Sequence, residues 1–162
     1  DHRRDQFRPY GTTPGHSFEW ARLLVQLRTL RGADWMLDAA EHLFVQAVLD
    51  GWDKAEGGLY YTVDGAGKPV VAERLHWPVT EAIGAAYYLY RVTGKPEYAE
   101  WYARFWAYLD SHFIDHEHGG WFHERTAAGG PSRTVWIGKP DLYHAVQATL
   151  YVKAQPQLPR LG

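Results

Sequence analysis

The chain has 162 residues, a formal net charge of −2, no cysteine and no basic run. The absence of cysteine excludes disulfide and thiolate chemistry. The absence of a basic run means that the sequence does not indicate binding to a nucleic acid or an anionic membrane. No apolar span is long enough to cross a membrane and the start is not signal-like, so we expect a cytoplasmic protein. Aromatic residues make up 15% of the chain, more than a simple core needs, which favours a cleft for a neutral ligand.

Five helices are predicted in chain order. Apolar residues such as Phe18 and Leu27 recur at helical spacing from Pro14 to Leu30, and Gly32 ends the run. The other predicted helices cover residues 34–49, 78–92, 96–113 and 140–154. Segments 58–63 and 120–125 alternate small or polar residues with aromatic ones, which predicts hairpin strands with turns at 64–65 and 128–130.

An internal repeat relates these elements. A shift of 62 residues without gaps places Glu19 on Glu81 and Gly32 on Gly94, and the match continues from residues 53–60 to residues 115–122. A second shift of 62 residues reaches the last predicted helix, so the third copy of the repeating unit contains only its first helix. Repeated helical hairpins form either an open solenoid or a closed ring. A ring of six such hairpins would be far longer than 162 residues, so the length favours a fragment.

Three predicted helices have a proline near their start: Pro14, Pro78 and Pro140. Proline is favoured at the first helical position, because its missing N–H needs no partner there. Four polar side chains would then lie close to helix N-termini: His16, Glu19, Glu81 and His144. Since the same ends of three helices can line one pocket, we expect a single shared site.

Each candidate has a functional and a simpler interpretation. The helix dipole keeps His16 neutral, as a general base requires, although a residue at a helix start can also bond its own backbone. Glu19 shares the helix face of His16 and is suited to orient it, or is merely a solvated first-turn glutamate. Small residues after Glu81 predict close packing beside a cavity that this carboxylate faces; capping is the alternative. Trp77 is either a stacking surface or part of the core.

His144 lies in the last predicted helix, and Lys139 and Asp141 flank the start of that helix as weaker candidates. A single buried histidine is usually structural, but its matched place in the repeat favours a functional role. The remaining histidines considered fit surface or loop positions and receive no role: His42, His112, His116, His118 and His123.

Residues 7–20 resemble a signature of the N-acylglucosamine 2-epimerase superfamily, and Trp77 with Glu81, the loop 119–122 and residues 139–144 resemble its later motifs in the same order. The resemblance covers nearly the whole chain but only the C-terminal portion of the longer family members. It implies an all-α fold in which helical hairpins form part of an (α/α)6 barrel, with short β-hairpins in the loops. Residues 1–155 would belong to this barrel domain, and residues 156–162 would be a disordered tail.

The resemblance further implies that the partner of this chain is the missing N-terminal half of the barrel, which in the family carries a substrate-binding arginine and another active-site histidine. The polar start without Met, residues 1–5, is what an internal cut would leave. Whether the subunits also form an oligomer stays open.

The same resemblance implies that His16 and His144 are the catalytic acid–base pair, and that Glu19, Trp77 and Glu81 hold a monosaccharide. A neutral imidazole can remove the acidic C2 proton of a ring-opened aldose to leave an enediol. Return of the proton to C1 yields a ketose, and return to the opposite face of C2 yields an epimer. Residues 7–20 are more similar to the aldose–ketose isomerase branch typified by mannose isomerases, so we expect mannose–fructose interconversion without a metal or other cofactor.

Other functions stay open. A sugar 2-epimerase would use the same histidines. Glu19 and Glu81 could instead flank a glycosidic bond in a glycoside hydrolase, which leaves the histidines without a role. His16 and Glu19 could ligate a cation, although no other residues complete the set. Finally, the chain could be a sugar-binding fragment without turnover.

Overall fold

In the computed structural model, which describes residues 5, 8–140 and 142–153, the chain forms five helices and four short strands. The helices are α1 (Pro14–Arg31), α2 (Trp35–Gly51), α3 (His76–Thr93), α4 (Pro96–His112) and α5 (Tyr143–Leu150). The strands are β1 (Thr62–Val63), β2 (Pro69–Val71), β3 (Arg74–Leu75) and β4 (Glu124–Arg125). None of the helices within these described residues has the length and apolar character needed to cross a membrane.

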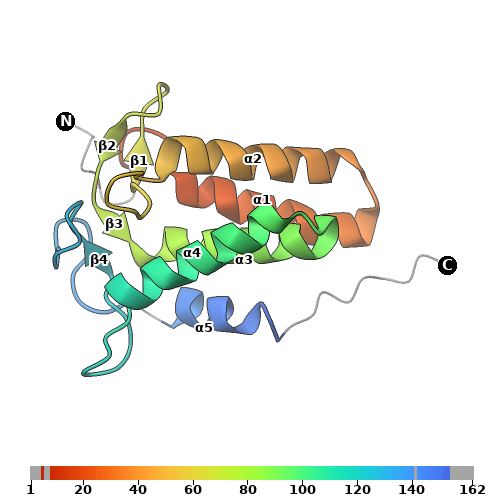
Figure 1. The fold of residues 1–162 in the computed structure, drawn as a ribbon. Helices are drawn as coiled ribbons and strands as arrows, with labels where there is room; N and C mark the ends of the chain where they lie inside the picture. The colour runs from red at the N-terminus through yellow and green to blue at the C-terminus, as the bar shows by residue number, and fades with distance from the viewer. Residues whose placement is uncertain (1–4, 6–7, 141, 154–162) are drawn as a thin grey trace.

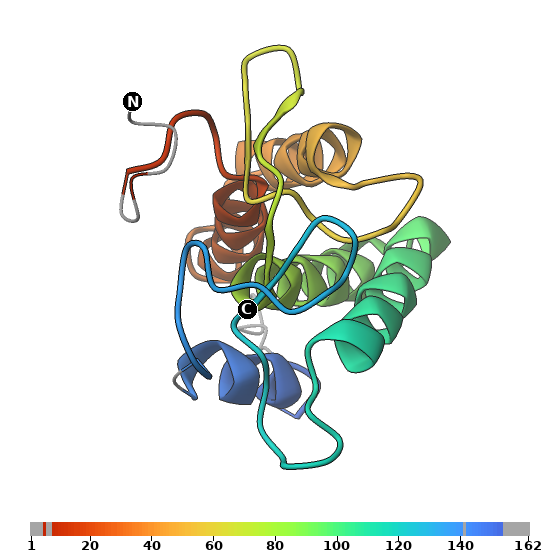
Figure 2. The same ribbon diagram turned by 90° about the vertical axis from the view of Figure 1, so that its left-hand side faces the viewer.

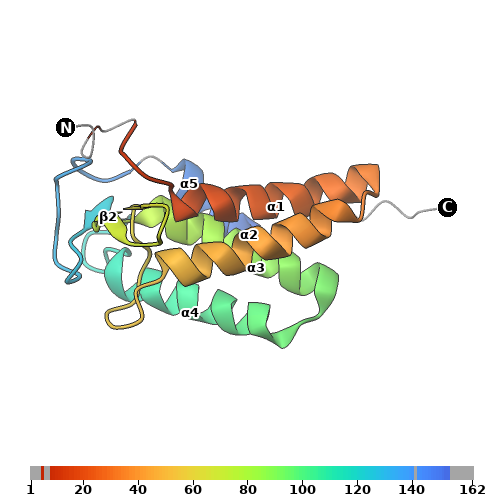
Figure 3. The same ribbon diagram turned by 90° about the horizontal axis from the view of Figure 1, so that it is seen from above.

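The helices form two layers. Seen end-on, α1, α3 and α5 lie side by side in one layer, and α2 and α4 cover one side of it (Figure 2). Each helix of the second layer runs back antiparallel to the one before it, so α1, α3 and α5 all begin at the same end of the molecule (Figures 1 and 3). The strands and their loops gather at that end. The predicted helical hairpins therefore bring three helix N-termini together.

Local sequence signals set most helix boundaries. Pro14 and Pro96 occupy the first turns of α1 and α4, where a missing N–H costs nothing. Gly32 and Gly94, which the repeat aligns, end α1 and α3 with φ of 68° and 69°. Each donates its N–H to the carbonyl oxygen four residues back, at 2.7 and 2.8 Å. Only glycine adopts this left-handed conformation without strain.

Two of the three predicted proline positions were wrong. α3 begins at His76, so Pro78 is its third residue; the N–H of His76 donates to the His123 carbonyl oxygen, which joins the helix start to the segment before β4. α5 begins at Tyr143, after Pro140, and ends at Leu150 rather than near residue 154. Before α5, Lys139 is held by contacts with the loop after α4, described below.

The strands are shorter than predicted, and one of them has a partner that the sequence did not predict. β1 and β2 form the expected antiparallel hairpin, closed by a hydrogen bond from the Asp64 N–H to the Lys68 carbonyl oxygen. β4 pairs with β3 from the preceding repeat, and the predicted local hairpin lies beside this pair as a bridge between Arg125 and Pro131, closed by a hydrogen bond from the Thr126 N–H to the Gly130 carbonyl oxygen. The cross-repeat pairing ties the two loop regions into one unit.

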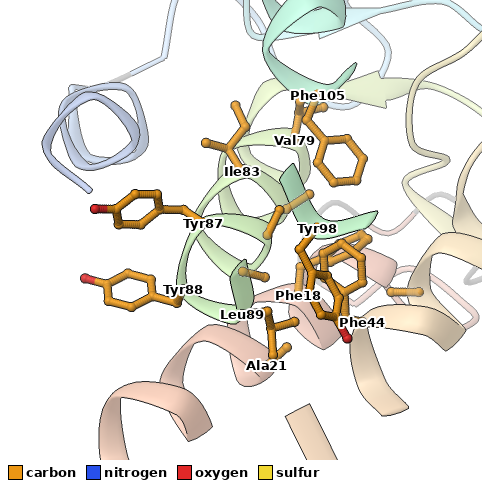
Figure 4. Packing of buried hydrophobic residues seen from close by; sticks show 14 of the residues in the cluster. Phe18, Ala21, Phe44, Val79, Ile83, Tyr87, Tyr88, Leu89, Tyr98 and Phe105 are labelled. Carbon is orange, nitrogen blue, oxygen red and sulfur yellow. The ribbon is translucent and has the colours of Figure 1, made fainter. Parts of the chain in front are cut away.

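The main core lies between the two layers. Phe18, Phe44 and Phe105 meet edge to face, with ring centroids 5.3 to 6.4 Å apart, and α3 adds Ile83 and Leu89 (Figure 4). Such aromatic pairs add about 0.5–1.5 kcal/mol each beyond their buried area. A second, smaller cluster beneath the loops contains Tyr61, Val71 and Leu75, with Trp77, Val135 and Trp136 packed against it.

Candidate active site

The side chain of Trp77 joins the two histidines predicted to be catalytic. Its ring centroid lies 5.0 Å from that of His16 and 5.9 Å from that of His144, with both ring pairs tilted by 39°. The three residues lie in the first turns of α1, α3 and α5. The convergence of three helix starts thus places two imidazoles around one indole.

The backbone of α1 allows this close approach. A Cβ atom on Gly15 would lie 2.7 Å from the Trp77 ring and 2.9 Å from Pro78 Cβ, so only glycine fits between the two helices. His16, the next residue, donates its N–H to the Thr13 carbonyl oxygen at 3.0 Å and leaves its side chain exposed. One side of the imidazole is therefore available to a ligand.

Glu81 is fully buried, in contrast to the cavity-facing carboxylate that its small neighbours suggest. Its Oε2 accepts a hydrogen bond from Arg22 Nε at 2.8 Å, and its Oε1 lies 4.0 Å from His144 Nε2. Burial raises the pKa of the Glu81 carboxyl, and the Arg22 guanidinium acts in the opposite direction. Residues from α1, α3 and α5 thus enclose this carboxylate.

The other predicted sugar-binding residues are more spread out. Glu19 is half-buried one turn after His16, and its charge raises the pKa of Glu81. Lys139 donates to Asp115 Oδ2 at 2.7 Å and to the Gly119 carbonyl oxygen, so its ammonium group is held by the loop after α4. This contact holds the pKa of Asp115 far below its usual range. Asp141 lies outside the described residues.

His76 lies beside the candidate site, and the sequence analysis missed it. It is buried as the first residue of α3, and its ring meets that of His144 edge to face, with centroids 5.8 Å apart. Its ring also meets that of His123, to which no role was assigned, with centroids 5.1 Å apart. The 62-residue shift aligns His76 with Pro14, the first residue of α1, and that alignment could have identified it.

A second buried carboxylate organises the loop beside these histidines. Glu124 accepts hydrogen bonds from the backbone N–H groups of Val135 and Trp136, both at 2.8 Å, and from Thr134 and Ser132. Burial raises its pKa, but these hydrogen bonds outweigh burial and leave the pKa below its usual value. The loop then places Trp136 flat against His123, with centroids 5.5 Å apart and an interplanar angle of 13°.

The arrangement offers two imidazoles for proton transfer, an indole for stacking on a sugar, and a loop rich in aromatic residues. Over residues 5, 8–140 and 142–153, no three His, Asp or Glu side chains are grouped in a way that could hold a metal ion.

Comparisons with known proteins identify the family of the chain. Residues 1–148 match the family model described as N-acylglucosamine 2-epimerase (GlcNAc 2-epimerase). The chain is 50% identical over 153 residues to a D-mannose isomerase of Pseudomonas cannabina pv. alisalensis and 46% identical over 155 residues to one of Thermobifida fusca. These matches cover 90% and 92% of this chain but 37% and 38% of the relatives, so the chain spans less than two-fifths of their length.

Solved structures extend the likeness to the fold. A crystal structure of D-mannose isomerase matches 92% of the chain and 39% of its own, with a TM-score of 0.85 and 30% identity. A cellobiose 2-epimerase from Bacillus thermoamylovorans B4167 matches 87% of the chain and 38% of its own, with a TM-score of 0.77 at 14% identity, which shows the fold alone. These neighbours are (α/α)6 barrels, which confirms the predicted fold class. The chain therefore belongs to the N-acylglucosamine 2-epimerase family.

Proposed function

We propose that this chain supplies the two-histidine part of an aldose–ketose isomerase site that acts on a monosaccharide of the mannose–fructose type. The approach of His16 and His144 to the single indole of Trp77 carries this proposal. Two relatives named D-mannose isomerase, at 50% and 46% identity, favour isomerisation over 2-epimerisation. The rat N-acylglucosamine 2-epimerase is 32% identical over 130 residues, a match that covers 75% of this chain and 30% of the relative.

The proposed chemistry is a proton transfer between neighbouring carbons of the open-chain sugar. One imidazole removes the C2 proton, the electron pair forms the C1–C2 double bond, and O1 takes a proton to give an enediol. The O2 proton then leaves as the ketone forms, and C1 receives a proton. Histidine suits both steps because its pKa lies near neutrality. In this proposal Trp77 stacks on the sugar and Glu19 binds a hydroxyl, with Lys139 and Asp141 as further binding residues.

The remaining part of the barrel is proposed to cover the two flanks of the inner layer. This layer consists of α1, α3 and α5, and its flanks are the exposed faces of α1 and α5. On α1, Trp20 and Leu27 are exposed two turns apart, and on α5, Tyr143 and Leu150 are exposed in the same way. Helix faces of this kind are usually buried by a neighbouring element. Since the relatives are more than twice as long, the proposed partner is the helical segment that closes their ring.

A glycoside hydrolase is the weaker candidate. An α-mannanase from Bacteroides thetaiotaomicron shares the fold at 15% identity, with a TM-score of 0.65 and 87% of this chain covered. Hydrolysis needs an acid and a base that flank the glycosidic bond. Glu81 is buried against Arg22, which makes it a poor candidate for either role, and hydrolysis would leave both histidines unused.

The test is NMR of D-mannose in D2O with this chain alone and with a chimera in which it replaces the matching part of the Pseudomonas D-mannose isomerase. We expect the chimera to form fructose. His16→Ala and His144→Ala should each slow the reaction about 100- to 10,000-fold. His42→Ala, at an exposed position on α2, should not affect it. Glucose without fructose would indicate an epimerase. A folded chimera with neither product nor deuterium exchange would contradict the proposal.

A further inference from the structure

The ion pair between Arg22 and Glu81 is almost completely buried. The Arg22 side chain is 5% exposed and that of Glu81 is 1% exposed, with 2.8 Å between Nε and Oε2. Removal of two charges from water costs several kcal/mol for each ion, and apolar residues of similar volume often fill such a space with equal or greater stability. The pair therefore requires an explanation beyond stability.

The surroundings of Arg22 hold its guanidinium in one place. NH1 donates to Gln26 Oε1 at 2.9 Å, and Gln26 Nε2 donates in turn to the Tyr88 hydroxyl at 3.2 Å. Gly84 of α3 leaves the space that the Arg22 stem occupies, because a Cβ there would lie 2.8 Å from Arg22 Cδ. The guanidinium also lies 5.5 Å from the centre of the Tyr151 ring. A side chain held on several sides can fix the carboxylate that it binds.

The other oxygen of that carboxylate is turned toward a proposed catalytic residue. With Oε2 held by Arg22, Glu81 Oε1 lies 4.0 Å from His144 Nε2. An anion at this distance stabilises the protonated imidazole by electrostatics. In acid–base sites, the base is often oriented by a third group that does not itself react.

We propose that Arg22 and Glu81 are positioning residues for His144: Arg22 keeps the Glu81 carboxylate ionised and turned so that Oε1 faces His144 Nε2. In this view Glu81 does not contact the sugar, which revises the role expected for it from the family resemblance. The catalytic role of Arg22 and Glu81 rests on the proposed function, whereas the ionisation of Glu81 and its coupling to His144 can be tested without turnover.

Several titratable groups face the Glu81 carboxylate. Arg22 lies on α1 and His144 on α5, and Tyr151 directly follows α5. Glu19 adds a like charge from α1, which raises the pKa of Glu81 together with burial. Arg22 lowers that pKa through both its charge and its hydrogen bond, so its loss should leave burial and Glu19 with less opposition.

The first experiment is a 13C NMR titration of the Glu81 carboxyl in the 162-residue chain. Arg22→Met should raise the pKa of Glu81 by about 1–3 pH units, and Arg22→Lys should restore much of the difference. Arg28→Met is the matched control, because Arg28 lies on the same helix and pairs with the exposed Asp34. An unchanged pKa of Glu81 in Arg22→Met would overturn the proposal.

The second experiment follows the imidazole of His144 by 15N NMR. Glu81→Gln should lower the pKa of His144 because the nearby anion is lost. Arg22→Met should also lower the pKa of His144, because Glu81 then takes up a proton. If Glu81 instead stayed ionised and only a cation were lost, the pKa of His144 would rise, and this result would overturn the proposal. If Arg22→Met does not fold, the unsubstituted chain provides the test: the titration of Glu81 must appear as an inflection in the His144 signal, and its absence would contradict the proposed coupling.

The third experiment uses the chimera with D-mannose. A positioning role predicts that Arg22→Met lowers kcat about 100-fold with little change in KM. A higher KM at unchanged kcat would return Glu81 to sugar binding and overturn the proposal. The two NMR experiments do not depend on turnover, so an inactive chimera would count against the proposed function alone.

Discussion

Trp77 on α3 lies against the imidazole of His16 on α1, with 5.0 Å between ring centroids, although the two residues belong to different repeats. Gly15 provides the space for the contact. The relative placement of two proposed site residues thus depends on the absence of a single Cβ atom.

Gly15→Ala should therefore disturb both stability and the site. Alanine usually stabilises the interior of a helix relative to glycine, but here the added methyl group overlaps the Trp77 ring. We expect a loss of about 1–3 kcal/mol in the free energy of unfolding, measured by urea denaturation. Gly65→Ala is the control, because a Cβ at Gly65 meets no atom within 4 Å. Equal stability of the two variants would show that the ring moves away without cost.

Asp53→Asn should destabilise the fold strongly. Arg74 is fully buried and donates to Asp53 Oδ2 at 2.7 Å, so loss of the carboxylate leaves a buried guanidinium without its counter-charge. We expect a loss of about 3–5 kcal/mol in the free energy of unfolding.

The next repeat supplies the comparison for this variant. The Lys139 side chain, which pairs with the buried Asp115, is 44% exposed. Lys139→Met should have a smaller effect, because the backbone N–H groups of Glu117 and His118 still bind the Asp115 carboxylate. Urea denaturation of both variants gives the ranking. A larger loss in Lys139→Met would contradict this explanation.

Acid should release the loop that carries Trp136. The folded-state pKa of Glu124 lies below its ordinary value, so the stabilisation it provides is complete above that ordinary value, about 4.3. It is lost as the pH falls from there through the folded-state pKa. Hydrogen exchange of the Val135 and Trp136 amides should accelerate over this range, beyond the intrinsic change with pH. Glu124→Gln should expose both amides already at neutral pH, and protection that does not depend on residue 124 would contradict the assignment.

The chain alone should self-associate through the flanks of the inner layer. Leu27→Lys and Leu150→Lys place a charge on the exposed apolar faces of α1 and α5 and should shift the chain toward the monomer. Size-exclusion chromatography with light scattering measures the change. Val45→Lys, at an exposed apolar position on α2, is the control and should leave association unchanged. A chain that is monomeric at high concentration would count against a partner on these faces.

Much of the helical framework could be predicted from local signals. Gly32 and Gly94 end their helices as the repeat indicates, and the helical spacing after Pro14 marks α1 correctly. The strands were harder to predict because β4 pairs with β3 as well as bridging to Pro131, its own neighbour in the chain. Pairing between repeats depends on how the hairpins stack, which a short window of sequence does not contain.

The sequence by itself determined the repeat, the helical hairpins and the family, because periodicity, caps and motifs are properties of neighbouring residues. Only the tertiary structure decided that Glu81 is buried against Arg22, that the ring of His76 contacts those of His123 and His144, and that Lys139 is held by Asp115. Each of these contacts joins residues from different elements. Their geometry and burial follow from how the helices pack, and the same packing sets the electrostatics of the proposed site.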